Sequence, residues 1–194
     1  MDYLKSRECR IIVIACNTAT TRCRRRLMEL YPDLIFVGTV PAVKVACDNN
    51  FKNTLVMATP ATIHSERLHQ IVDENVRNDQ NIYLVPCYGL ANAIERRDEE
   101  AIDIILSATF QKYRDKSIDS IVLGCTHYPF IKDRIAEMMP QAELLDGANG
   151  VARETRHQME MHGLTPYGQT GNIEIFFSEN NDNTKAYVQQ FMTE

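Results

Sequence analysis

Leu123-Gly124-Cys125-Thr126-His127-Tyr128-Pro129-Phe130 stands between a predicted strand and a predicted helix. It follows the short apolar run Ser120-Ile121-Val122, and it precedes residues 131–139, whose apolar positions have helical spacing. A thiol therefore lies beside backbone N–H groups and the positive end of a helix dipole, which both favour an anion. A free cysteine ionises near pH ~8.5, and such a position can lower its pKa by one to several units. We therefore predict that Cys125 is a reactive, acidified thiol.

The same arrangement occurs near the start of the chain. Residues 10–15 form a β-branched run typical of a strand, and Cys16 and a helical stretch to Leu30 follow it. Asn17 and Thr18 carry the side-chain oxygens that helix N-caps prefer. Two acidified thiols that face a small ligand from opposite sides suit proton removal on one face of a carbon and proton delivery on the other.

The chain as a whole alternates between strand and helix patterns, which predicts an α/β fold. Alternating elements with short links favour mostly parallel sheets flanked by helices, with ligands bound beyond the carboxyl ends of the strands. Both thiols and a loop at 59–62 fall at such ends. We predict strands at 10–15, 34–37, 54–57, 82–85, 120–122, 143–145 and 173–177. We predict helices at 3–9, 21–30, 41–45, 64–76, 90–113 with a break near Arg97-Asp98, 131–139, 151–162 and 184–191.

The likeness of the two cysteine units predicts two pseudo-symmetric lobes with the active site between them. The first lobe would comprise residues 1–38 and 146–194 and carry Cys16. The second would comprise residues 39–145 and carry Cys125.

Composition restricts the class of protein. The formal net charge of −5 and the isoelectric point near 5.6 argue against nucleic acid as a partner. The sequence contains no run of eighteen apolar residues, so it predicts no membrane span. Six cysteines are scattered without the spacing of a disulfide framework or a zinc site, so we expect no metal and a reducing, cytoplasmic location. We expect Cys9, Cys23, Cys47 and Cys87 to pack rather than react.

Two motifs resemble those of a known family. Ala15-Cys16-Asn17-Thr18-Ala19 and Leu123-Gly124-Cys125-Thr126-His127-Tyr128-Pro129 are similar to the two cysteine motifs of glutamate racemases. Residues 38–44, 58–63, 87–95 and 171–174 also look like family landmarks. The resemblance implies a racemase without a cofactor that interconverts L- and D-glutamate for cell-wall peptidoglycan.

The resemblance also implies roles for individual residues. Cys16 and Cys125 would be the two acid/base thiols, His127 would assist the second, and Glu95 matches a family carboxylate on that side. Thr59 and Thr62 match threonines that contact the substrate. From the residues themselves, we expect Asn17, Thr18 and Thr126 to add hydrogen bonds around the substrate.

The chain departs from the family pattern before Cys16. The family opens with Asp-Ser-Gly and Pro-Tyr-Gly segments, which do not precede Cys16 here, and Pro166-Tyr167-Gly168 lies after the second cysteine. We therefore expect an incomplete first lobe with an exposed sheet edge, which favours a homodimer, and weak or absent turnover. A second hypothesis is a catalytically inactive, truncated racemase remnant or a binding protein. A third is a Cys–His hydrolase that uses Cys125 and His127, which leaves the Cys16 unit unexplained.

Overall fold

The computed structural model describes residues 1–164 and 173–177. The chain divides into two compact units, Met1–Gly163 and Leu164–Glu194. Residues 173–177, in the second unit, do not form a strand, so the strand predicted there is wrong. Apolar, β-branched composition favours a strand but does not by itself produce one. The helix predicted at 184–191 and Pro166-Tyr167-Gly168 lie outside the described residues.

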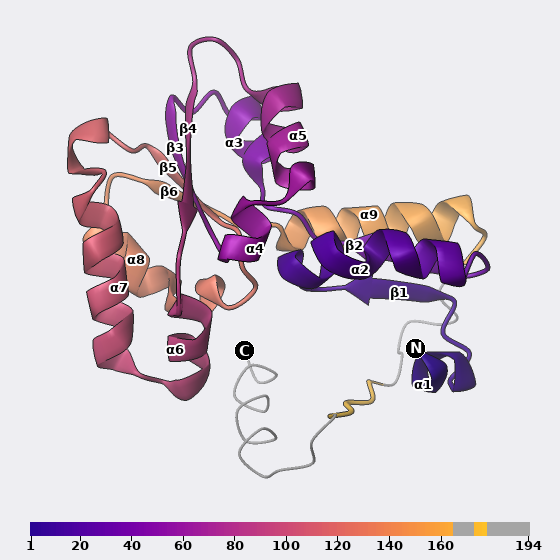
Figure 1. Cartoon of the computed structure of the whole chain (residues 1–194). Helices are drawn as coiled ribbons and strands as arrows, with labels where there is room; N and C mark the ends of the chain where they lie inside the picture. Colours follow the sequence, from indigo (N-terminus) through magenta and orange to yellow (C-terminus); the bar gives the residue numbers. More distant parts are fainter. Residues whose placement is uncertain (165–172, 178–194) are drawn as a thin grey trace. The chain divides into compact units, whose positions relative to one another are not determined.

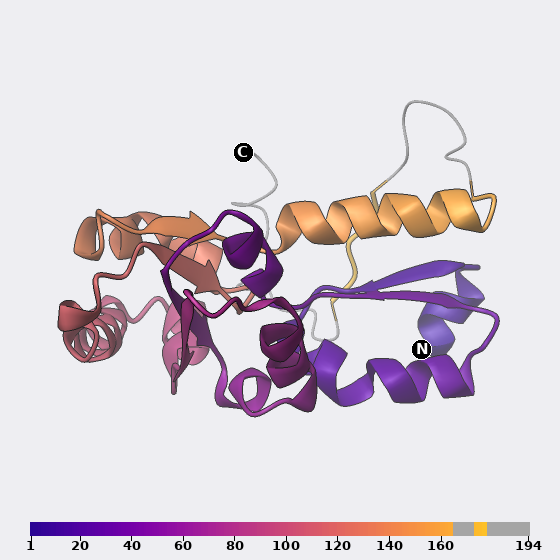
Figure 2. The same cartoon turned by 90° about the horizontal axis from the view of Figure 1, so that it is seen from above.

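The first unit contains two parallel sheets flanked by helices, as predicted for an α/β fold. The smaller sheet pairs β1 (Ile11–Ile14) with β2 (Ile35–Gly38), in register from Ile11↔Ile35 to Ile14↔Gly38. Helix α2 (Asn17–Leu30) covers one face of this sheet and α9 (Ala148–Met161) covers the other (Figures 1 and 2). The short helix α1 (Asp2–Ser6) precedes β1.

The larger sheet has the strand order β4-β3-β5-β6. Its strands are β3 (Asn53–Ala58), β4 (Asn81–Pro86), β5 (Ser120–Leu123) and β6 (Glu143–Leu145). Helices α3 (Val43–Asp48) and α5 (Glu66–Asn75) lie on one face, and α6 (Leu90–Arg96), α7 (Glu99–Gln111) and α8 (Lys132–Met138) lie on the other (Figure 1). The helix α4 (Pro60–Ile63) and the 3₁₀ turns η1 (Arg114–Lys116) and η2 (Tyr128–Ile131) complete this part. The lobe boundaries at residues 38 and 146 stay a prediction.

The core of the larger sheet is divided between its two faces. Side chains alternate across a strand, so Leu55 and Met57 of β3 point into one apolar cluster while Val56 and Ala58 point into the other. All four are fully buried. Because both faces are covered, the strands are apolar after their first one or two residues, as expected for a parallel sheet.

Several predicted elements begin or end elsewhere. The predicted loop at 59–62 is largely the helix α4, because Pro60 takes the first helical position and the Thr59 side chain accepts a hydrogen bond from the Thr62 N–H. The predicted helix at 131–139 is confirmed as α8, and the turn η2 directly precedes it. The predicted break near Arg97-Asp98 is confirmed: Arg97 has a left-handed backbone and Asp98 caps α7.

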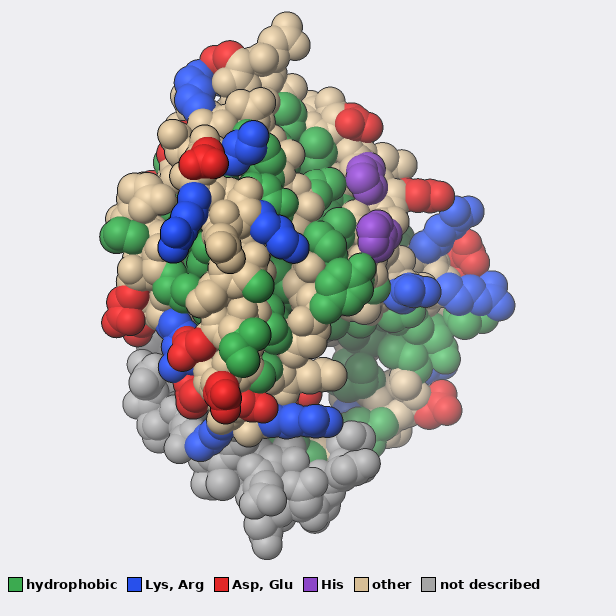
Figure 3. Space-filling view, turned by 60° about the vertical axis from the view of Figure 1, so that its left-hand side comes forward, with side chains coloured by type: hydrophobic (Ala, Val, Ile, Leu, Met, Phe, Trp, Pro, Cys, Tyr) green, Lys and Arg blue, Asp and Glu red, His purple; other side chains and the backbone are tan. Residues whose placement is uncertain are grey.

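The surface agrees with the acidic composition. Acidic and basic side chains are interspersed over the face shown in Figure 3. Within residues 1–164 and 173–177, no helix has the length and apolar character that crossing a bilayer requires.

Candidate active site

Cys16 itself caps helix α2. Its backbone is extended, and its sulfur accepts a hydrogen bond from the Ala19 N–H at 3.4 Å. The expectation that Asn17 or Thr18 supplies the N-cap is therefore wrong by one or two residues, because the helix begins directly after the cysteine. The sulfur of Cys16 thus lies at the N-terminus of a fourteen-residue helix.

Asn17 presents a buried acceptor beside this thiol. Its side chain is 6% exposed, and its Oδ1 atom has no hydrogen-bond partner among the described residues. Buried polar atoms are nearly always paired in native proteins. An acceptor that the fold leaves unpaired next to Cys16 is therefore suited to a polar ligand.

Three threonine hydroxyls link the Cys16 unit to the end of strand β3. Thr18 Oγ1 lies 2.7 Å from Thr59 Oγ1 and 3.3 Å from Thr62 Oγ1, and the last two atoms are 3.1 Å apart. Thr62 is buried, whereas Thr18 and Thr59 are half-buried. This threonine triangle (Thr18, Thr59 and Thr62) joins helix α2 of the smaller sheet to helix α4 of the larger one.

Cys125 is placed by the close approach of Gly124 to strand β3. The Gly124 N–H donates to the Met57 carbonyl at 2.7 Å. A Cβ at position 124 would lie 2.8 Å from that carbonyl oxygen and 2.9 Å from the Ala58 Cβ. Only glycine fits without displacement of buried main chain, so the chain turns tightly here and delivers Cys125 beyond the carboxyl end of β5.

Cys125 differs from the predicted acidified thiol. Burial raises the pKa of the Cys125 thiol, and negative charge at Cys16 and at Glu95 raises it further, whereas a backbone hydrogen bond from His127 lowers it. The side chain is 7% exposed, and no α-helix begins until Lys132, so the expected helix dipole is absent from this position. The thiol of Cys125 therefore needs a nearby base to ionise.

His127 and Glu95 form a chain of contacts that leads to this thiol. The Cys125 sulfur lies 3.6 Å from His127 Nδ1, and His127 Nε2 lies 2.7 Å from Glu95 Oε1. Glu95 is on the last turn of α6 and is exposed, as its run of charged neighbours predicts, but it is paired with the histidine. The three side chains form a thiol–imidazole–carboxylate relay. Thr126 lies exposed between Cys125 and His127.

The structure therefore brings the two cysteine units together. Cys16 is close enough that its charge raises the pKa of Cys125. The threonine triangle connects the segment after β1, the strand that precedes Cys16, to the segment after β3, which pairs with the strand that precedes Cys125. Among the described residues, no group of three His, Cys, Asp or Glu side chains is arranged to hold a metal ion.

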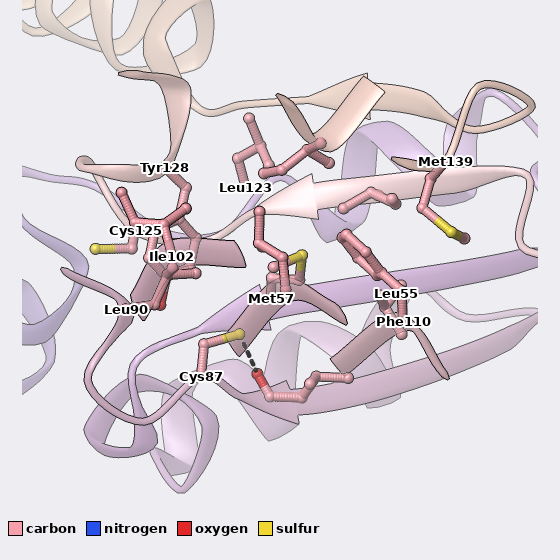
Figure 4. Packing of buried hydrophobic residues seen from close by; sticks show 14 of the residues in the cluster. Leu55, Met57, Cys87, Leu90, Ile102, Phe110, Leu123, Cys125, Tyr128 and Met139 are labelled. Atoms are coloured by element: carbon pink, nitrogen blue, oxygen red, sulfur yellow. Dashed lines mark hydrogen bonds between the residues drawn. The ribbon is translucent and has the colours of Figure 1, made fainter. Parts of the chain in front are cut away.

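Sequence reasoning did not anticipate the surroundings of Cys125. Cys87 and Tyr128 are buried in the same apolar cluster, and burial raises the pKa of the Cys87 thiol to about 12. Burial also raises the pKa of Tyr128. Figure 4 shows the Cys125 sulfur directed away from this cluster, whereas the Cys87 sulfur is directed toward the Val85 carbonyl of β4. Cys87 comes directly after β4, but it is buried, which agrees with the expectation that it packs rather than reacts.

Comparison with known proteins gives the family. Residues 1–155 match the family described as Asp/Glu/Hydantoin racemase. The chain belongs to this racemase family. A glutamate racemase of Clostridium perfringens is 37% identical to this chain over 183 residues. The match covers 92% of this chain and 70% of that protein.

Solved structures of racemases show the same fold. A glutamate racemase of Francisella tularensis in complex with D-glutamate matches with a TM-score of 0.82 and 22% identity, over 100% of this chain and 73% of the other. A glutamate racemase of Escherichia coli with L-glutamate and the activator UDP-MurNAc-Ala matches with a TM-score of 0.76 and 24% identity, over 94% and 70% of the two chains.

Proposed function

We propose that this racemase-family chain interconverts L-glutamate and D-glutamate by proton transfer at Cα between two thiols, without a cofactor. The observation that carries the proposal is the relay from Glu95 through His127 to Cys125, in electrostatic contact with Cys16. The 37% identity to a glutamate racemase supports glutamate as the substrate, and the D-glutamate held by a protein of the same fold agrees with it.

The reaction needs one base and one acid on opposite faces of a carbon. A thiolate takes the proton from Cα and becomes a thiol, while the other thiol gives its proton to the opposite face and becomes a thiolate. The substrate keeps its atoms and inverts its configuration. Positioned proton transfer contributes about 10²–10⁴-fold to the rate, so electrostatic stabilisation of the carbanion-like state must supply much of the rest.

Each thiol is activated differently. Cys16 is the N-cap of helix α2, and its sulfur accepts a hydrogen bond from the Ala19 N–H. Cys125 is buried, so His127 Nδ1 accepts its proton and the imidazolium that forms is stabilised by Glu95 at Nε2. The raised pKa of Cys125 makes this base necessary for catalysis, because burial alone would keep the thiol protonated.

Polar side chains around the two thiols suit an α-amino acid. The unpaired Asn17 Oδ1 accepts from the ammonium group, because that atom is an acceptor only. The hydroxyls of Thr18, Thr59, Thr62 and Thr126 donate to carboxylate oxygens. Binding would then exchange part of the threonine triangle for hydrogen bonds to the substrate.

The biological setting belongs to the same proposal. D-Glutamate serves peptidoglycan synthesis, the thiols require a reducing compartment such as the cytoplasm, and the chain acts as a homodimer. Light scattering of the purified chain tests the last point, and a monomer at all concentrations would contradict it.

Circular dichroism tests the activity directly. The signal of L-glutamate incubated with the purified chain should decay to zero, and that of D-glutamate should decay to the same baseline. A steady signal from a chain with a cooperative thermal transition would instead support the inactive remnant or a binding protein.

A further inference from the structure

We propose that Arg134 is a positioning residue for the second thiol: it holds helix α7 against α8 so that Glu95 stays in place to orient His127. The inference rests on the proposed function, since it assigns Arg134 a role only if the relay to Cys125 takes part in proton transfer.

The guanidinium of Arg134 binds the first turns of α7 at three points. Its Nη2 atom lies 2.5 Å from Glu99 Oε2, and its Nη1 atom lies 3.4 Å from Asp103 Oδ1. Nη1 also donates to the backbone carbonyl of Glu99 at 3.4 Å. The Arg134 side chain is 30% exposed. A planar guanidinium that binds two carboxylates and a main-chain oxygen fixes an orientation, whereas a single exposed ion pair does not.

Helix α7 is joined to Glu95 by a constrained corner. Glu95 lies on the last turn of α6, Arg97 has φ of 55° in the left-handed region, and the Asp98 side chain accepts from the Ala101 N–H to start α7. A left-handed conformation at a residue other than glycine persists only where the surroundings hold it. Arg134 binds Glu99, the first residue of α7 and two residues beyond Arg97, and so fixes the start of α7 directly after this corner.

The other end of Arg134 is joined to His127. Helix α8 continues directly from the turn η2, whose N-cap is His127. One guanidinium therefore ties the segment that carries the imidazole to the helix pair that carries its carboxylate partner. Apolar packing of Ile94, Leu106 and Ile135 already brings these helices together, but burial is not directional. The ion-pair network is directional, and it sets the rotation on which the 2.7 Å contact between Glu95 and His127 depends.

The test compares Arg134→Met and Arg134→Lys with two reference variants. Glu95→Gln weakens the relay itself. Lys52→Met is the matched control, because it also removes an exposed ion pair, with Asp79, but at the amino end of β3, opposite the site. The measurements are kcat and KM for both enantiomers, and the primary isotope effect on kcat/KM with glutamate deuterated at Cα.

We expect Arg134→Met to lower kcat by about fivefold with KM unchanged, since exposed ion pairs are worth up to about that factor. The isotope effect should rise for one enantiomer only, the same one for which it rises in Glu95→Gln, because only one direction uses Cys125 as the base. Arg134→Lys should recover part of the loss, and Lys52→Met should match the wild type. A loss of folded protein alone would lower kcat without moving the isotope effect.

The outcomes separate the two proposals. Wild-type isotope effects in Arg134→Met, together with a raised one in Glu95→Gln, would overturn the role of Arg134 and leave the relay standing. Unchanged isotope effects in Glu95→Gln, or no racemisation by the wild type, would overturn the relay and the role of Arg134 with it. If Arg134→Met does not fold, the double variant Glu99→Gln/Asp103→Asn removes the same carboxylate contacts, and the same criteria apply.

Discussion

Thr18 and Thr59 share a hydrogen bond between side-chain oxygens 2.7 Å apart, although 41 positions separate them in the sequence. Thr18 lies in the first turn of the helix that Cys16 caps, and Thr59 caps the short helix α4 after β3. This contact links the first thiol to the sheet that carries the second. The distance between the two thiols therefore depends in part on a pair of neutral hydroxyls.

Substitution of Thr18 by valine tests this link. Thr18→Val keeps the shape of the side chain but removes its hydrogen bonds to Thr59 and Thr62, so we expect the free energy of unfolding to fall by about 1 kcal/mol. We also expect KM to rise, because a substrate-binding hydroxyl is lost. Urea denaturation and steady-state kinetics measure the two effects. Thr21→Val is the control, since its hydroxyl bonds only to the Asn17 carbonyl of the same helix.

The two thiols should each be indispensable. Cys16→Ser and Cys125→Ser should each lower kcat at least about 10²-fold, because a hydroxyl is a much weaker acid than a thiol and positioned proton transfer is lost. Cys23→Ser, whose thiol donates to the Ala19 carbonyl of its own helix, should retain wild-type activity. Circular dichroism of either glutamate enantiomer gives the rates. Full activity in either active-site variant would contradict a two-thiol mechanism.

Removing the charge of Glu95 should change the ionisation of Cys125. Negative charge at Glu95 raises the pKa of the Cys125 thiol, so Glu95→Gln should lower that pKa. The alkylation rate of Cys125 by iodoacetamide, followed by mass spectrometry of its peptide, should then reach its midpoint at lower pH than in the wild type. Catalysis should nevertheless fall, because His127 loses the partner of its imidazolium. Glu74→Gln, on the exposed side of α5, should leave the midpoint unchanged.

The two glycines at positions 124 and 150 predict opposite effects of the same substitution. Gly124→Ala places a methyl group against the Met57 carbonyl and Ala58, so we expect a destabilisation of about 2 kcal/mol and displacement of Cys125. Gly150 lies within α9, and a Cβ added there would meet no atom within 4 Å apart from its own helix backbone and chain neighbours. We therefore expect Gly150→Ala to stabilise the protein by up to about 1 kcal/mol. Thermal and urea denaturation measure both. Equal effects would show that the close approach at Gly124 is not as described.

Cys87 should make the fold sensitive to alkaline pH. Burial raises its pKa from an ordinary value of 9.0 to about 12. Between pH 9 and 12 the unfolded chain loses this proton while the folded chain keeps it. The free energy of unfolding is therefore unaffected by Cys87 below pH 9 and falls by about 1.4 kcal/mol per pH unit as the pH rises toward 12. Cys87→Ser cannot ionise in this range, so its free energy of unfolding should fall less steeply with pH. Identical slopes for the two proteins between pH 9 and 11 would contradict the burial of a neutral thiol at this position.

Local pattern was sufficient for most elements of the fold. The apolar runs at 120–122 and 143–145 are strands as predicted, and the break near Arg97-Asp98 is confirmed because both the charge pattern and the capping side chain are local signals. The helix start after Cys16 was less accurate, because α2 begins at Asn17 and not at Thr21. Cysteine is not a usual N-cap, so the local pattern gave no signal for this start. The strand predicted at 173–177 is wrong, because β-branched composition is a weak and context-dependent signal.

By itself the sequence determined which groups the proposed chemistry would use: two thiols at strand ends, a histidine two residues after one of them, and threonines between. Only the tertiary structure decided how these groups act, because pKa values and hydrogen bonds depend on neighbours that are distant in the chain. It buried Cys125 where the sequence predicted an acidified thiol, and it brought Glu95 to His127 from 32 residues away. It also brought Arg134 to Glu99 from 35 residues away. Burial and long-range pairing arise only when the whole sheet packs, so no local pattern contains them.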